Sequence, residues 1–217
     1  GFFTVYGDTD GASVTRGMGD AWDIITDMAI KLSPGGHPSH SLAEAAANAA
    51  RAGQIAPDDV ETITLSRPGV TALTGPIHPT DFIDMAHCPA YFLAAGVANH
   101  GFSWEHAAEA KITDPVIHQL IDKVQVGPPP TQEVERYKQG ATVTIQTKDG
   151  RTFTSTVFAP KGAGVLGIDW ADVDAKYRSL VPQAQVSGQQ VESSLRVIHD
   201  FANFKHVSEL TDLLHAY

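Results

Sequence analysis

The feature that most limits how this chain can fold is a glycine-containing bend in residues 31–40. Pro34, Gly35 and Gly36 form the bend, and Lys31 and His40 lie on its two sides. Glycine has no Cβ, so the backbone of such a bend can approach a ligand closely. A bend of this kind with cationic side chains beside it is typical of a site that binds an anion.

An alanine-rich run follows the bend and predicts a helix. Ser41 and Glu44 have the spacing of a capping box, so we expect the helix to start at about Ser41 and to run to Gly53. The first turn of a helix has unpaired N–H groups that favour negative charge. The helix start therefore adds to the predicted anion site.

Composition excludes several classes of protein. The chain has 217 residues, 42% of them hydrophobic, and a formal net charge of −10, which argues against a nucleic-acid partner. No apolar run reaches the roughly 20 residues of a membrane span, and no signal peptide is visible. The single cysteine, Cys88, excludes an internal disulfide and an all-cysteine metal cluster. We therefore expect a cytoplasmic protein that binds neither membrane nor nucleic acid.

The middle of the chain alternates between strand and helix patterns. Val60 to Leu65 predicts a half-buried strand, and the apolar spacing from Asp81 to Asn99 predicts a buried helix that breaks near Pro89. Two more strands, residues 142–146 and 152–158, should form a β-hairpin around the turn at Asp149 and Gly150. Further helices are expected at residues 104–110, 114–124, 170–181, 191–198 and 207–214.

The order of these features resembles one enzyme family. Lys31, Pro34 and His40 before an alanine-rich helix resemble a local pattern of the MmgE/PrpD family. Later segments, such as 114–124 and 176–180, follow the C-terminal half of that family from end to end. The family contains lyases and isomerases that act on small di- and tricarboxylates, and its fold requires no metal or organic cofactor.

The resemblance implies a fold and a domain organisation. We expect an α+β fold with a small antiparallel sheet in a lid domain, residues 31–178. Residues 1–30 would end a helical-domain segment, and residues 179–217 would return to that helical domain. The long helical N-terminal half of the family has no counterpart here, so it is the expected partner, and the assembled unit is expected to form a dimer.

The resemblance also implies site residues. The predicted catalytic groups are Lys31, His37 and Tyr91, and the predicted substrate-binding groups are Gly35, Gly36 and His40. Lys31 would hold a carboxylate, and Tyr91 would donate a proton. A satisfied core tyrosine is the alternative for Tyr91.

Two of these assignments have alternatives, which are evenly balanced for His37 and slightly favour a structural role for His40. The position where the family has a cysteine or histidine is Gly36 in this chain. The neighbouring His37 either performs the function of that residue or the function is absent. His40 matches a family histidine, but a residue beside a helix start can also simply stabilise the helix. Histidines elsewhere lack metal-ligand spacing, so no metal site is predicted.

Dehydration of a 2-methylcitrate-like acid is the favoured reaction, and decarboxylation or isomerisation of an aconitate-like acid is the alternative. A subunit without catalytic activity, which completes or regulates a helical partner, is a hypothesis of a different class. A free-standing ligand-binding domain is the third and weakest hypothesis.

Overall fold

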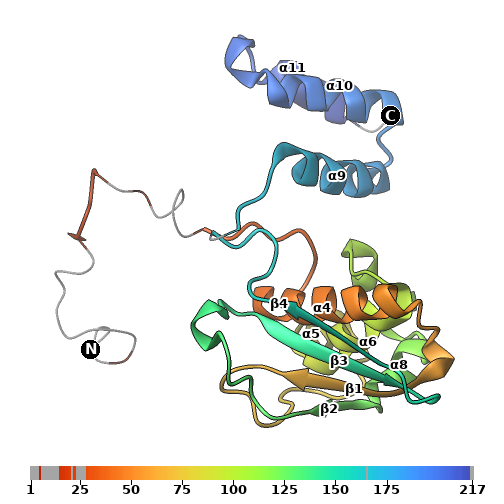
Figure 1. The fold of residues 1–217 in the computed structure, drawn as a ribbon. Coiled ribbons are helices and arrows are strands. Elements are labelled where there is room, and N and C mark those ends of the chain that lie inside the picture. Colours follow the sequence, from red (N-terminus) through yellow and green to blue (C-terminus); the bar gives the residue numbers. More distant parts are fainter. Residues whose placement is uncertain (1–4, 6–14, 21, 23–27, 165, 216–217) are drawn as a thin grey trace.

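The computed structural model describes residues 5, 15–20, 22, 28–164 and 166–215 (Figure 1). A four-stranded sheet with helices on one face forms the larger part, and helices α9 to α11 form a smaller group beside it. Most of the predicted segment 1–30 lies outside the described residues, so its assignment to a helical domain stays a prediction.

The sheet confirms the α+β fold class and adds one parallel pair. Its strands, in the spatial order β2-β1-β3-β4, are β1 (Val60–Ser66), β2 (Val124–Val126), β3 (Ala141–Thr147) and β4 (Thr152–Val157). The hairpin β3–β4 is antiparallel, as predicted, and β3 is also antiparallel to β1. Strand β2 runs parallel to β1, which makes the sheet mixed. The sequence pattern did not predict β2, because its three residues are too short to show an alternation.

Helix α4 (His37–Gly53) starts earlier than predicted. Gly36 is the residue before the first turn, and Pro38 lies within that turn, where its fixed φ suits a helix start. Ser41 is therefore inside the helix, and its hydroxyl donates to the carbonyl oxygens of Pro38 and Gln139. The predicted capping box of Ser41 and Glu44 is wrong for this reason, whereas the predicted end at Gly53 is confirmed.

The buried helix between β1 and β2 is broken at the predicted place. It consists of α5 (Phe82–Ala86) and α6 (Pro89–Asn99), and Cys88 accepts the N–H of Tyr91 at the start of α6. The elements that follow before β2 are η2 (Trp104–Ala107), α7 (Glu109–Ile112) and α8 (Pro115–Ile121). A 3₁₀ turn, η1 (Pro57–Asp59), precedes β1, and another, η3 (Val134–Arg136), precedes β3.

One face of the sheet packs against the helices, and the other carries threonines. Val143 and Ile145 of β3 are fully buried beneath α4, α6 packs on α4, and α8 packs on α6. On the opposite face, Thr142 and Thr144 bond the hydroxyls of the facing threonines on β4. This alternation places the core on the helix side of the sheet only.

The C-terminal helices have a small core of their own. They are α9 (Trp170–Leu180), η4 (Val181–Ala184), α10 (Gly188–His199), η5 (Phe201–Asn203), α11 (Ser208–Thr211) and η6 (Asp212–Leu214). Val186, Val191 and Leu195 form this core, against which Tyr177 packs from α9. The domain boundary predicted at residue 178 falls within α9, and the domain assignment stays a prediction. Among the described residues, no helix has both the length and the apolar character needed to cross a membrane.

Candidate active site

The Lys31 loop is held in shape by its own backbone and by one glycine. Lys31 Nζ donates to the Gly35 carbonyl oxygen at 3.0 Å. Gly35 has a φ of +87°, and a Cβ there would lie 2.5 Å from the Phe92 ring. Both facts require glycine at this position. From α9, Lys176 Nζ donates to the Lys31 carbonyl oxygen at 2.7 Å and so fixes the start of the loop.

A surface hollow of about 410 Å³ lies against this loop. Lys31, Gly35 and Gly36 line it on one side, and His87 and Trp104 line it on another. The structure thus brings together three of the predicted site residues. The Lys31 side chain is exposed, so its charge is available to a ligand in the hollow.

A second cavity, of about 270 Å³, adjoins the first, and Ser33 lines both. His40, Glu44 and Arg51 line it from α4, and Lys161 lines it from the segment after β4. Residues 40, 44 and 51 share one face of α4 because a helix repeats every 3.6 residues. Sequence reasoning missed Glu44 and Arg51 as cavity residues, although this helical spacing was a signal that could have found them.

His40 is a buried, neutral imidazole. Its Nε2 lies 3.0 Å from the Pro34 carbonyl oxygen, which can only accept, so Nε2 carries the proton and Nδ1 keeps a free lone pair. Burial, together with the charges of His37 and Lys31, lowers the pKa of His40 to about 4, against the opposing effect of the hydrogen bond to Pro34. His40 can therefore accept a proton or a hydrogen bond at neutral pH.

His37 packs against His40 instead of lining the hollow. The two rings meet edge to face with centroids 5.2 Å apart. Both ring nitrogens of His37 are buried, and neither has a hydrogen-bond partner among the described residues. Burial lowers the pKa of His37, and the charge of Lys31 lowers it further. A side chain at Gly36 would fit, because its Cβ would lie 3.6 Å from the Ala86 carbonyl oxygen.

Glu44 is the acidic member of the second cavity. Burial raises the pKa of Glu44, against a hydrogen bond from the Lys161 backbone and the charges of Lys161 and Arg51. Lys161 Nζ also bonds the carboxylate of Asp172 at the start of α9. The cavity therefore combines two cations with a carboxyl group that protonates more readily than usual.

Tyr91 lies in the core, away from both cavities. Its side chain is fully buried, and its hydroxyl donates to the His106 carbonyl oxygen at 3.0 Å. Its ring meets Phe92 and Phe102 edge to face. Burial raises the pKa of Tyr91 above its usual range. This position favours the role of a core tyrosine, and the proton-donor role stays a prediction without support from the geometry.

Replacement of Tyr91 by phenylalanine separates the two roles. We expect the free energy of unfolding to fall by about 1–3 kcal/mol, because the His106 carbonyl oxygen loses a buried partner. Urea denaturation measures this loss. In the lyase complex that is proposed below, we expect turnover to stay within about twofold, whereas loss of a catalytic proton donor would lower it by about 100-fold or more.

The low pKa of His40 predicts a pH dependence of stability. The unfolded residue takes up a proton near the ordinary histidine pKa of 6.5, and the folded residue only near 4. Stability contributed by neutral, buried His40 should therefore be complete above pH 6.5 and decline as the pH falls toward 4, by about 3 kcal/mol at most. Urea denaturation at about pH 7 and about pH 5 should show a smaller pH effect in His40→Gln than in the unmodified chain. An equal pH effect in both would contradict the prediction.

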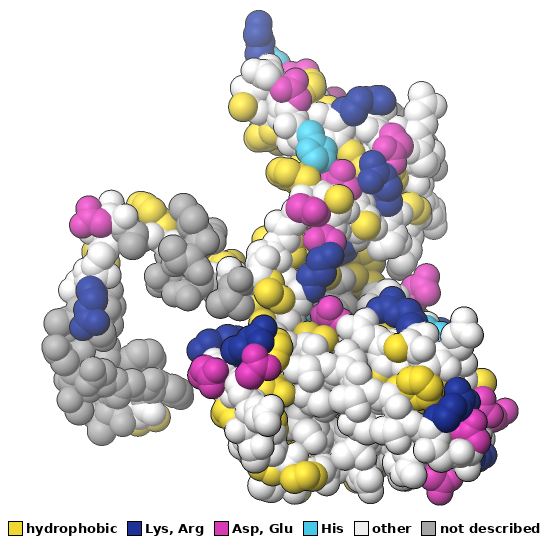
Figure 2. Space-filling model, viewed as in Figure 1, with side chains coloured by type: hydrophobic (Ala, Val, Ile, Leu, Met, Phe, Trp, Pro, Cys, Tyr) yellow, Lys and Arg dark blue, Asp and Glu magenta, His cyan; other side chains and the backbone are white. Residues whose placement is uncertain are grey.

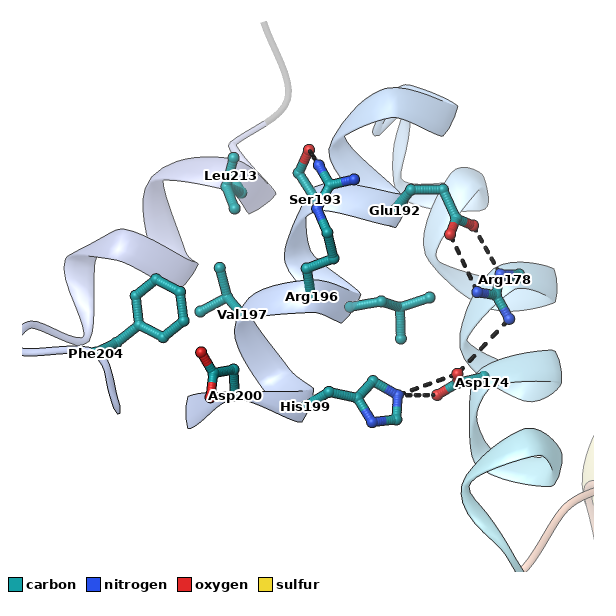
Figure 3. Close-up of a pocket in the computed structure, with 11 residues that line it drawn as sticks. Asp174, Arg178, Glu192, Ser193, Arg196, Val197, His199, Asp200, Phe204 and Leu213 are labelled. Carbon is teal, nitrogen blue, oxygen red and sulfur yellow. Dashed lines mark hydrogen bonds and ion pairs between the residues drawn. The ribbon is translucent and has the colours of Figure 1, made fainter. Parts of the chain in front are cut away.

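A larger hollow than these two lies elsewhere, among α9 to α11 (Figure 3). It has a volume of about 760 Å³. Arg178 bonds both carboxylate oxygens of Glu192 beside it, and Asp174 bonds Nε2 of His199. These pairs join α9 to α10. Arg178 and His199 are paired with carboxylates, and Arg196 donates to the Ser193 hydroxyl. The predicted site residues do not line this hollow, so it is a groove between helices.

Charge is distributed in small groups over the visible face (Figure 2). Basic side chains lie close to acidic ones on both the sheet unit and the C-terminal helices. A chain with a net charge of −10 could bind an anion only at local groups of cations, such as Lys31 beside the first cavity or Arg51 and Lys161 in the second.

Comparison with known proteins agrees with this fold. The profile of the MmgE/PrpD C-terminal domain matches residues 34–200. Cis-aconitate decarboxylase of Homo sapiens is 25% identical over 193 residues, which are 87% of this chain and 40% of that protein. Cis-aconitate decarboxylase of Mus musculus is 25% identical over 195 residues, 87% of this chain and 39% of that protein. The chain thus spans about two fifths of the length of these relatives. It belongs to the MmgE/PrpD family, and it carries the family's C-terminal domain.

Proposed function

We propose that this chain is the C-terminal part or small subunit of an MmgE/PrpD-type lyase that acts on a small di- or tricarboxylate. The observation that carries the proposal is the hollow at the Lys31 loop, in a chain of this family. An exposed ammonium group and the glycine backbone of the bend can hold one carboxylate there. The adjoining cavity, with Arg51 and Lys161, can hold a second.

The chemistry of such acids needs a group that moves a proton next to a carboxylate. His40 is neutral and buried, and it has a free Nδ1 lone pair. A bound polyanion would raise the pKa of His40, because negative charge nearby favours the imidazolium form. Substrate binding therefore makes His40 a stronger base. Removal of His40 should then lower kcat more than it raises KM.

Two reactions fit this site. Dehydration of a 2-methylcitrate-like acid is the first candidate. The relatives are named cis-aconitate decarboxylase, and this favours decarboxylation of an aconitate-like acid as the second. Both reactions require the same carboxylate contacts, so the choice between them depends on groups that a partner contributes.

The expected partner is the helical half of the family fold, and it would contact this chain at two surfaces. The exposed Lys31 side of the hollow would be covered by this partner, which would exclude water from the substrate. Apolar side chains in the α9–α11 groove, such as Phe204 and Leu213, would pack against it as well. By analogy with the family, the assembled unit would be a dimer.

Co-expression with a polypeptide that carries the helical half tests the proposal. We expect the two to co-purify and the complex to consume cis-aconitate or 2-methylcitrate, measured by the absorbance of the carbon–carbon double bond and by release of CO₂. A complex that forms but converts none of these acids would favour the hypothesis of a subunit without catalytic activity. A stable, ligand-binding monomer that ignores the helical half would favour a free-standing domain.

A further inference from the structure

A pair of histidines outside the candidate site is arranged in an unusual way. His78 ends the loop after β1, and His118 lies on α8. Their Nδ1 atoms are 3.0 Å apart, and their rings are nearly parallel, with an interplanar angle of 19°. This pair does not line the Lys31 hollow or the His40 cavity.

The outer nitrogen of each ring is already used as a donor. Nε2 of His78 lies 2.8 Å from the carboxylate of Asp122, and Nε2 of His118 lies 2.7 Å from the carbonyl oxygen of Ile112. A carboxylate and a carbonyl oxygen accept hydrogen bonds, so both Nε2 atoms carry protons. In two neutral rings, both Nδ1 atoms therefore present lone pairs toward each other. Two lone pairs at 3.0 Å repel unless both nitrogens share a cation, which is either a proton in an N–H···N hydrogen bond or a metal ion bound to both.

We propose that His78 and His118 bind one divalent transition-metal ion of the tetragonal type, such as Ni²⁺ or Cu²⁺, through their Nδ1 atoms. When two nitrogens each bind one ion at about 2.1 Å and the N–metal–N angle is a right angle, the nitrogens lie about 3.0 Å apart. The distance between the two Nδ1 atoms has this value. Imidazole is also a ligand that these ions prefer.

The outer hydrogen bonds support a metal site. Histidines that bind metals usually donate their other N–H to a carboxylate or a backbone carbonyl, which fixes the ring and makes the binding nitrogen more basic. Asp122 and Ile112 accept these hydrogen bonds here. The described residues contain no group of three or more His, Cys, Asp or Glu side chains in a metal-binding arrangement, so the chain supplies two ligands and water supplies the rest.

The side chain of His78 ties the loop after β1 to α8 and to Asp122 at its end. The φ of His78 is +58°, a left-handed conformation that costs energy in any residue other than glycine. The side-chain contacts to α8 hold it in this conformation. A bound ion would fasten the end of the loop to α8, and the loop begins at Arg67, which donates to the Pro38 carbonyl oxygen in the first turn of α4.

Isothermal titration of the untagged full chain with Ni²⁺ tests this inference, because an affinity tag of histidines would bind the ion itself. We expect one site, and we expect His78→Gln and His118→Gln each to weaken it more than about tenfold. Asp122→Asn should weaken it about tenfold, since it removes only the outer hydrogen bond. His206→Gln, at an exposed histidine on the C-terminal segment, should leave the affinity unchanged.

Circular dichroism would confirm that each variant folds, and hydrogen exchange of residues 69–80 should slow when Ni²⁺ is added to the unmodified chain. Absence of Ni²⁺ binding by the unmodified chain would overturn the inference, and so would equal binding by His118→Gln and His206→Gln. These readouts do not use catalytic activity, so they succeed or fail independently of the proposed lyase function.

Discussion

Replacing Lys31 by methionine is expected to lower kcat/KM of the proposed lyase complex by about 100-fold. A hydrogen bond to a charged partner contributes about 1.5–3 kcal/mol, and about 1.4 kcal/mol corresponds to a tenfold change. Misplacement of the substrate adds to this loss. The Lys31 side chain is exposed in this chain, so the substitution should change the free energy of unfolding by only about 0.5 kcal/mol. Steady-state kinetics and urea denaturation measure the two effects separately.

Lys148→Met is a matched control for this experiment. Lys148 is an exposed lysine in the β3–β4 turn, away from both cavities, so its loss should leave kcat/KM unchanged. Lys31→Arg should recover part of the activity, because it keeps the charge but not the shape. Full turnover by Lys31→Met would rule out the carboxylate clamp and would favour the hypothesis that this subunit only completes a catalytic partner.

Replacing Gly96 by alanine is expected to destabilise the fold by about 3 kcal/mol. Gly96 lies on α6, where α6 packs against α4, and a Cβ there would lie 2.4 Å from the Ala43 carbonyl oxygen. It would also lie 3.1 Å from the Cβ of Ala46. The contact is with backbone, so the two helices would have to separate, and overpacking of this kind costs about 1–3 kcal/mol or more.

A glycine without such a neighbour should respond to the same substitution in the opposite direction. At an exposed helix position, alanine stabilises relative to glycine by about 1 kcal/mol. A Cβ at Gly188, in the first turn of α10, would meet no atom within 4 Å, so Gly188→Ala is the control and should be neutral or stabilising. Urea denaturation of both variants gives the comparison. A stabilised Gly96→Ala would contradict the close approach of α4 and α6.

Several elements were predictable because their patterns are local. The hairpin of β3 and β4 follows from alternation around Asp149 and Gly150. The break between α5 and α6 follows from Pro89, whose ring and missing N–H end a preceding helix. The start of α4 was misplaced because Ser41 and Glu44 have the spacing of a cap, while Pro38 begins the helix one turn earlier.

The candidate site was predictable only in part. The bend with Lys31, Gly35 and Gly36 was recognisable from the sequence, and the structure places these residues around one hollow. Tyr91 matched a family motif, but burial between Phe92 and Phe102 separates it from that hollow. A motif match specifies residue type and spacing, whereas exposure depends on what packs against the residue.

Most of the helices and strands and the α+β class follow from the order of the amino acids alone, and so does the prediction of an anion site at the Lys31 loop. Three features emerged only from the folded chain: β2 pairs parallel to β1, Glu44 and Arg51 share a cavity with Lys161, and the ring nitrogens of His37 are buried. The difference lies in the range of the interactions. Turns and periodicities act between neighbours in the chain, but pairing, burial and pKa depend on segments that only folding brings together.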